Sequence, residues 1–177
     1  EIVLKMNNNK VCIIAEAGVN HNGDLEIAKR LVDCAAEAGA DIIKFQTFKA
    51  ENLAIEKAEK ANYQKDTTGV EETQFQMLKK LELTENMHDE LIRYCNDKNI
   101  QFLSTPFDIE SIHFLSNKDI SVFKIPSGEI TNLPYLREIG KQNKDVILST
   151  GMSNMVEVNA AIEILQKLEP WLETAVG

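Results

Sequence analysis

Two lysines of this sequence stand inside apolar runs, where a charged side chain is unusual. Lys44 lies within residues 41–48 (DIIKFQTF), and Lys124 lies within residues 121–129 (SVFKIPSGE). Each run has the length and composition of a short buried strand. Burying an ammonium group is costly unless a negative charge pairs with it. Two such lysines, each followed by polar residues, therefore indicate a pocket for a small anion.

The residues around Lys44 also indicate which side of the strand carries the chemistry. Side chains alternate between the two faces of a strand, so Lys44 and Gln46 share one face. Ile43 and Phe45 share the opposite face, which is apolar. We therefore expect one face of this strand to pack in the core and the other to line the anion pocket.

These lysines belong to a regular alternation of predicted strands and helices. An apolar run ends in a polar loop, a helix capped by Asp24 and stopped by Gly39 follows, and the strand of Lys44 comes next. This order makes a βαβ unit. Strands are predicted at residues 11–15, 42–45, 101–104, 122–125 and 146–149. Helices are predicted at residues 25–38, 74–80, 85–99, 108–116, 133–142 and 155–168, with a long polar loop at 49–73.

The alternation predicts an α/β protein with a parallel sheet, and the strand ends favour a TIM-type (β/α)8 barrel. Polar residues follow every predicted strand: Glu16, Gln46, Thr105, Ser127 and Thr150. In such a barrel all strand ends converge on one active face. A flavodoxin-like sheet, the alternative, would place its ligand at a single switch point. The chain would cover about five of the eight βα units of a barrel, which would leave two open strand edges.

The composition restricts the partners that this chain can have. Its net charge of −9 argues against a nucleic-acid partner, which would need a basic patch. No apolar run approaches the ~18 residues of a membrane span, and no signal peptide is visible. The three cysteines lack the spacing of a redox or zinc motif. We therefore expect buried free thiols in a cytoplasmic protein.

Five short motifs, in their order along the chain, resemble motifs of the sialic acid synthases. They are IAEAGVNHNG at 14–23, IKFQTF at 43–48, LSTPF at 103–107, FKIPSGE at 123–129 and LSTGM at 148–152. The resemblance implies that residues 10–168 are the N-terminal portion of a (β/α)8 synthase barrel. Residues 1–9 would form an N-terminal extension, and the tail at 169–177 does not resemble the family.

The resemblance implies a reaction and a set of residues for it. These enzymes condense phosphoenolpyruvate (PEP) with N-acetylmannosamine or a related 2-acetamido sugar to give a nonulosonic (sialic-type) acid and phosphate. The positions that match PEP-binding residues are Lys44, Thr105, Lys124, Ser127 and Ser149. The positions that match sugar-binding residues are Glu16, Gln46, Tyr63 and Glu129. Glu16 and Glu129 are the candidate catalytic residues, and either could move protons or orient the sugar.

The same resemblance implies a cofactor and an assembly. The family uses a divalent metal, manganese foremost with magnesium or cobalt as alternatives, held by two histidines on later strands. No metal ligand is therefore expected in this chain. His21 is expected to form hydrogen bonds within its loop, and His88 and His113 are expected to pack or to face solvent. The implied assembly is a homodimer.

The sequence leaves three functions open. The first is a PEP-dependent sialic-type synthase, with N-acetylmannosamine and a diacetamido sugar as alternative acceptors. The second is another PEP-dependent aldol-type sugar-acid synthase, which the motif at residues 14–23 disfavours. The third is a non-catalytic fragment or assembly module. Because metal-assisted chemistry needs fixed ligands at the reacting aldehyde, we expect the 177-residue chain alone to be inactive.

Overall fold

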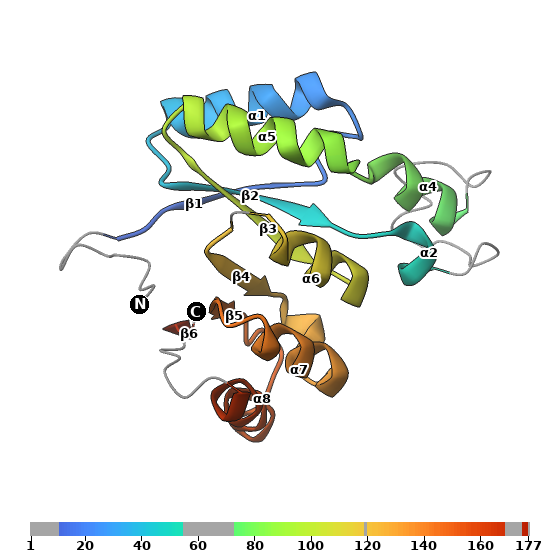
Figure 1. Ribbon diagram of the computed structural model, residues 1–177, viewed down its shortest axis with the longest axis vertical. Coiled ribbons are helices and arrows are strands. Elements are labelled where there is room, and N and C mark those ends of the chain that lie inside the picture. The colour runs from blue at the N-terminus through green and yellow to red at the C-terminus, as the bar shows by residue number, and fades with distance from the viewer. Residues whose placement is uncertain (1–10, 55–72, 119, 169–174, 177) are drawn as a thin grey trace.

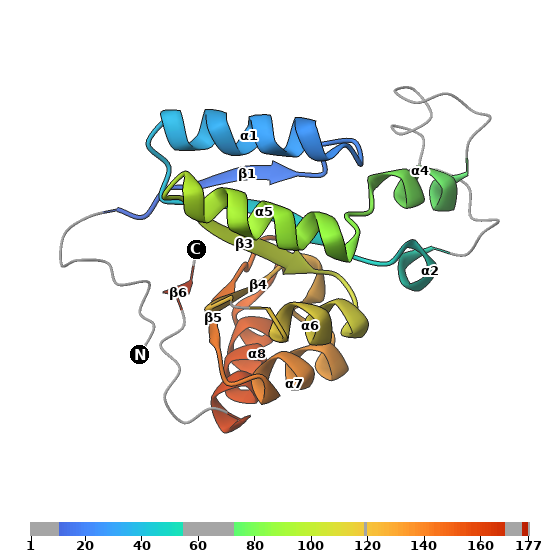
Figure 2. The same ribbon diagram turned by 45° about the horizontal axis from the view of Figure 1, so that its top comes forward.

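The structure is a computed structural model that describes residues 11–54, 73–118, 120–168 and 175–176. Its parallel strands form a curved layer, and its helices cover the outer side of that layer (Figure 1, Figure 2). The expected N-terminal extension at residues 1–9, the sugar-site residue Tyr63 and most of the tail at 169–177 lie outside the described residues.

The strands follow one another in chain order, as a barrel requires. The described strands are β1 (Ile14–Gly18), β2 (Ile42–Thr47), β3 (Gln101–Pro106), β4 (Val122–Ile125), β5 (Asp145–Leu148) and β6 (Ala175–Val176). Paired neighbours are parallel, in the orders β1-β2-β3 and β4-β5-β6, and β4 lies next to β3 (Figure 2). In a doubly wound sheet the first strand would lie in the middle, whereas here β1 is followed by β2 and then β3. The chain therefore forms part of a TIM-type barrel.

Two strands differ most from the sequence prediction. β1 runs from Ile14 to Gly18 and not over residues 11–15. Ile13 is still joined to the start of β2, because its main-chain oxygen accepts from the N–H groups of Asp41 at 2.9 Å and Ile42 at 3.1 Å. There the main-chain N–H of Ile13 donates to the carboxylate of Asp41 at 2.8 Å. β6 has no counterpart in the prediction, since a strand of two residues is too short to show an alternating pattern. It pairs with β5 through Ala175 opposite Ile147.

The helices begin where the sequence places capping side chains. They are α1 (Leu25–Glu37), α2 (Ala50–Leu53), α4 (Gln74–Leu81), α5 (Glu85–Asp97), α6 (Ile109–Ser116), α7 (Leu133–Lys141) and α8 (Met155–Leu168), with a 3-10 turn, η1 (Ser127–Glu129). Asp24 caps α1 by accepting from the N–H of Ile27, and Thr84 caps α5 in the same way. α2 lies in the segment predicted as a loop, because four residues cannot show a helical period.

The two faces of the strand layer hold separate apolar clusters. On the outer face Ile43 and Phe45 of β2 pack in the large cluster beneath the helices, and Phe45 stacks on Phe102 of β3 with ring centroids 5.6 Å apart. The inner face holds a smaller cluster formed by Ile42, Leu103 and Val122. This arrangement confirms the alternation that was predicted for residues 42–46.

The cysteines correct one expectation from the sequence. Cys95 is buried and Cys12 is partly buried, but Cys34 is exposed, so the prediction that every thiol is buried is wrong. The reason is helical geometry, since α1 buries Val32 and Ala35 and turns the position between them outward. Within the described parts of the chain, no helix is long and apolar enough to span a membrane.

Candidate functional site

The inner face of the strand layer becomes polar toward the carboxyl ends of the strands. Glu16 of β1 lies beside Lys44 of β2, and Gln46 of β2 lies beside Thr105 of β3. Lys124 of β4 stands two residues beyond the inner apolar cluster, as Lys44 does. The alternation of side chains therefore places these polar residues on one face, in layers nearer to the carboxyl ends.

Lys44 forms an ion pair with Glu16 across the β1–β2 ladder. The side chain of Lys44 is 14% exposed, whereas that of Glu16 is 53% exposed. A lysine this enclosed needs a negative partner, and the neighbouring strand supplies one. The carboxylate of Glu16 faces open space and is accessible to a ligand.

Lys124 is held at the end of β4 by two hydrogen bonds. Its ammonium group donates to the Ser149 hydroxyl at 2.5 Å and to the main-chain oxygen of Ile125 at 2.9 Å. Burial, and after it the positive charge of Lys44, lowers the pKa of Lys124 to about 8, while Glu16 opposes the shift. Lys44 and Lys124 each stand two residues after a member of the inner apolar cluster, so the alternation of side chains places both on the same side of the sheet.

Hydroxyl groups lie around the two ammonium groups. Thr105 is 2% exposed, and its Oγ1 has no hydrogen-bond partner among the described residues. Ser127 lies against Gly151, where an added Cβ would be 3.5 Å from Ser127 Oγ. Gly151 comes two residues after Ser149, so the turns after β4 and β5 meet here.

The two candidate carboxylates have different surroundings. Glu16 contacts Lys44, whereas Glu129 accepts a hydrogen bond from the side-chain amide of Asn132 at 2.6 Å. Asn132 also caps α7 through the N–H of Tyr135. Our sequence reasoning did not single out Asn132, although an asparagine two residues before a proline is a typical helix start. The start of α7 therefore holds Glu129 in place.

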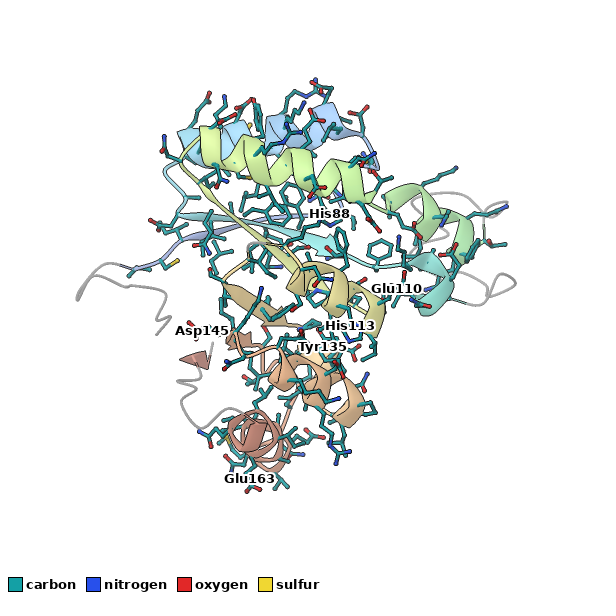
Figure 3. All side chains as sticks on the ribbon, in the orientation of Figure 1. His88, Glu110, His113, Tyr135, Asp145 and Glu163 are labelled. Atoms are coloured by element: carbon teal, nitrogen blue, oxygen red, sulfur yellow. The ribbon has the colours of Figure 1, made fainter. Side chains whose placement is uncertain are left out.

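The three histidines do not contribute to the polar inner face. His21 is buried in the β1–α1 loop, where its Nδ1 accepts the N–H of Gly23 at 3.0 Å, and burial lowers its pKa. His88 of α5 packs against the end of β2, where its Nε2 lies 2.8 Å from the Thr47 hydroxyl, and Figure 3 shows where His88 and His113 lie. His113 of α6 pairs with Glu138. The loop role of His21 and the packing role of His88 confirm the prediction. No group of His, Cys, Asp and Glu side chains in the described ranges could hold a metal.

A cavity of about 370 Å³ lies on the other side of the sheet, at the end of β2 and beside α5 and α6. Its lining includes His88, Glu110 and His113 (Figure 3). None of the predicted site residues lines this cavity. The candidate site is therefore the polar inner face, which gathers two lysines, a carboxylate, an amide and several hydroxyls.

Known proteins share both the sequence and the fold of this chain. The NeuB family model matches residues 31–171. The N,N'-diacetyllegionaminic acid synthase of Campylobacter jejuni is 57% identical over 158 residues, which are 89% of this chain and 47% of that protein. The enzyme of the same name from Legionella pneumophila is 51% identical over 154 residues, which are 87% of this chain and 43% of that protein. The chain spans about half the length of the curated relatives it matches.

A solved structure gives the same picture. The N-acetylneuraminic acid synthetase of Leptospira borgpetersenii, crystallised in complex with citrate, is similar to this chain with a TM-score of 0.78 and 31% sequence identity. The match covers 96% of this chain and 54% of that one. At this identity and coverage the likeness extends over nearly the whole chain.

Proposed function

This chain belongs to the NeuB family, the family of the sialic acid synthases, and we propose that it forms the PEP-binding part of such a synthase. In the proposed reaction the methylene carbon of PEP bonds to the aldehyde carbon of N-acetylmannosamine or a related 2-acetamido sugar. Water adds to the middle carbon of PEP, and phosphate leaves. The observation that carries the proposal is that Lys44, Lys124 and the buried Thr105 lie on one face of the strand layer.

Two ammonium groups and neutral hydroxyls suit the charge of PEP. PEP concentrates its negative charges in a small volume, and Lys44 and Lys124 would neutralise them as compact cations. The hydroxyls of Thr105, Ser127 and Ser149 would donate hydrogen bonds without adding a competing negative charge. An anion between the two ammonium groups would also relieve the mutual repulsion that contributes to the lowered pKa of Lys124.

We assign Glu16, Gln46, Tyr63 and Glu129 to the acceptor sugar. Glu16 lies beside Lys44, so its carboxylate would border both the PEP and the sugar. There it would orient a sugar hydroxyl or move a proton at the aldehyde oxygen. Glu129, held by Asn132, is the alternative for the same role. The assignment of Tyr63 rests on the family motif alone.

The proposal includes a divalent metal but no step that runs through it. Manganese, magnesium or cobalt would polarise the sugar aldehyde as a Lewis acid when bound. In the family that this chain resembles, two histidines on later strands hold the metal, so we propose that its ligands come from outside this chain. A homodimer is proposed on the family resemblance alone.

Phosphate release tests the proposal in two proteins. One is the 177-residue chain, and the other is a chimera in which it replaces the matching segment of the Campylobacter jejuni synthase. Given PEP, manganese and either N-acetylmannosamine or a diacetamido sugar, we expect the chimera to release phosphate with one of them. We expect the chain alone to bind PEP without turnover.

The matched control is a chimera with Lys44→Met and Lys124→Met, which should lose PEP-dependent turnover. If the parent enzyme releases phosphate and a folded chimera does so with neither sugar, the proposed function is wrong. Turnover by the chain alone would refute the expectation that the metal ligands lie elsewhere.

A further inference from the structure

The first strand is irregular at the point where it enters the candidate site. Glu16 pairs with Lys44 and Gly18 pairs with Phe45, so two steps along β1 correspond to one step along β2. Ala17 is the extra residue of this irregularity, which has the form of a β-bulge. Glu16 stands immediately before this irregularity, on the inner face where the alternation of β1 places it. Its carboxylate contacts Lys44, and Gly18 follows two residues later.

Gly18 is the residue that permits this local shape. Its φ of +54° lies in the left-handed region, which glycine adopts without strain. A Cβ at this position would stand 3.2 Å from Glu16 Oε1 and 3.7 Å from Gln46 Nε2. The first distance is tighter than an ordinary contact, so a side chain at this position requires the Glu16 carboxylate to shift by a few tenths of an ångström. The bare Cα of Gly18 therefore faces both proposed sugar-binding groups.

We propose that Gly18 is a positioning residue that keeps the carboxylate of Glu16 on Lys44 and leaves the space between Glu16 and Gln46 open for a polar group of the acceptor sugar. The inference rests on the proposed function for the identity of the ligand. The role given to Gly18 rests only on the register shift in β1, the left-handed backbone at Gly18 and the Cβ distances to Glu16 and Gln46. Gly18 touches no reacting atom in this scheme and acts through Glu16.

The proposal predicts opposite effects on the two substrates when Gly18 carries a methyl group. Shifting the Glu16 carboxylate weakens a sugar contact, so the KM for the sugar should rise by up to about tenfold. The same displacement frees Lys44 from a competing carboxylate, so the affinity for PEP should stay the same or rise about fivefold. General distortion of the site would weaken both substrates together.

The test compares Gly18→Ala with Gly39→Ala. Gly39 also has a left-handed backbone, with a φ of +79°, but a Cβ there would meet no described atom within 4 Å. The control therefore carries the backbone strain without the contact. PEP affinity is measured by calorimetry on the 177-residue chain, and the sugar KM is measured by phosphate release from the chimera.

A double-mutant cycle with Glu16→Gln shows whether Gly18 acts through Glu16. We expect Glu16→Gln to strengthen PEP binding about fivefold in the original chain. In a chain that already carries Gly18→Ala, the same substitution should change the free energy of PEP binding by less than half as much. In the Gly39→Ala background its effect should be undiminished. The inference is overturned if the effects add in both backgrounds, if Gly18→Ala behaves like Gly39→Ala, or if it weakens PEP and sugar equally. An inactive chimera would refute the proposed function, while the calorimetric cycle would still decide the role of Gly18.

Discussion

The proposed PEP site should bind its anion less well as the pH rises through about 8, because Lys124 loses its proton there. Burial and the charge of Lys44 lower the pKa of this lysine to about 8. The neutral amine keeps its place near Ser149 but no longer attracts an anion. PEP binding that requires the ammonium form must therefore follow its population.

The size of the effect follows from this pKa. At pH 7, one unit below this pKa, Lys124 is protonated in about nine tenths of the molecules, and at pH 9 in about one tenth. PEP affinity should therefore fall about tenfold between pH 7 and pH 9. Lys124→Met removes the charge at every pH. At pH 7 it should cost a charge-assisted interaction of ~1.5–3 kcal/mol, or about 10- to 150-fold in affinity. Its remaining pH dependence should be small.

Calorimetric titration of the 177-residue chain with PEP from pH 7 to pH 9 measures this directly. The arginine of Lys124→Arg stays protonated throughout this range, so this variant should bind PEP with little pH dependence. Any pH dependence that remains in this variant measures the ionisation of PEP itself and is subtracted. Lys141→Met removes an exposed positive charge on α7 and serves as the matched control, with the original pH profile expected. If the original chain binds PEP equally at pH 7 and pH 9, or if Lys124→Met shows the same tenfold fall, the reasoning is refuted.

Three further predictions concern the stability of the fold and are read from thermal or denaturant unfolding. Burial lowers the pKa of His88 from 6.5 to about 4. As the pH falls, the unfolded chain therefore binds a proton at this histidine before the folded chain does. About 3 kcal/mol of the free energy of unfolding should be lost between pH 6.5 and pH 4, and His88→Gln should not show this loss. Gly23→Ala should lower the unfolding midpoint more than Gly39→Ala, because only at Gly23 would the Cβ meet a backbone oxygen, that of Lys80, at 2.1 Å; equal midpoints would contradict this close approach. Tyr135→Phe should cost about 1 kcal/mol, since the buried hydroxyl donates to the main-chain oxygen at the end of β3 at 2.8 Å, and an unchanged stability would show that this bond contributes nothing net.

The sequence predicts the strands and the polar face well because both depend on a period of two. Ile43 and Phe45 had to share one face and Lys44 and Gln46 the other, whatever the tertiary structure. Val122 and Ile42 share the inner cluster, so Lys124, two residues after Val122, lies on the same face as Lys44. This part of the site could therefore be predicted from the local alternation of apolar and polar residues along each strand.

Other features of the site depend on contacts between distant segments, which no local pattern encodes. The bulge at Ala17 arises from the pairing of β1 with β2. The exposure of Cys34 depends on which side of α1 meets the sheet. Each follows from packing partners that become known only when the chain is folded.

The arrangement of residues on the polar face is not the one that stability alone would favour. The Lys44 ammonium lowers the pKa of Lys124, and Glu16 offsets only part of that repulsion. Thr105 keeps a hydroxyl buried with no partner among the described residues, and an apolar side chain of similar size would avoid this desolvation cost. In the proposed function, a compact anion would offset the repulsion between the two lysines and accept a hydrogen bond from Thr105. The polar groups that cost stability would then be the ones that serve binding.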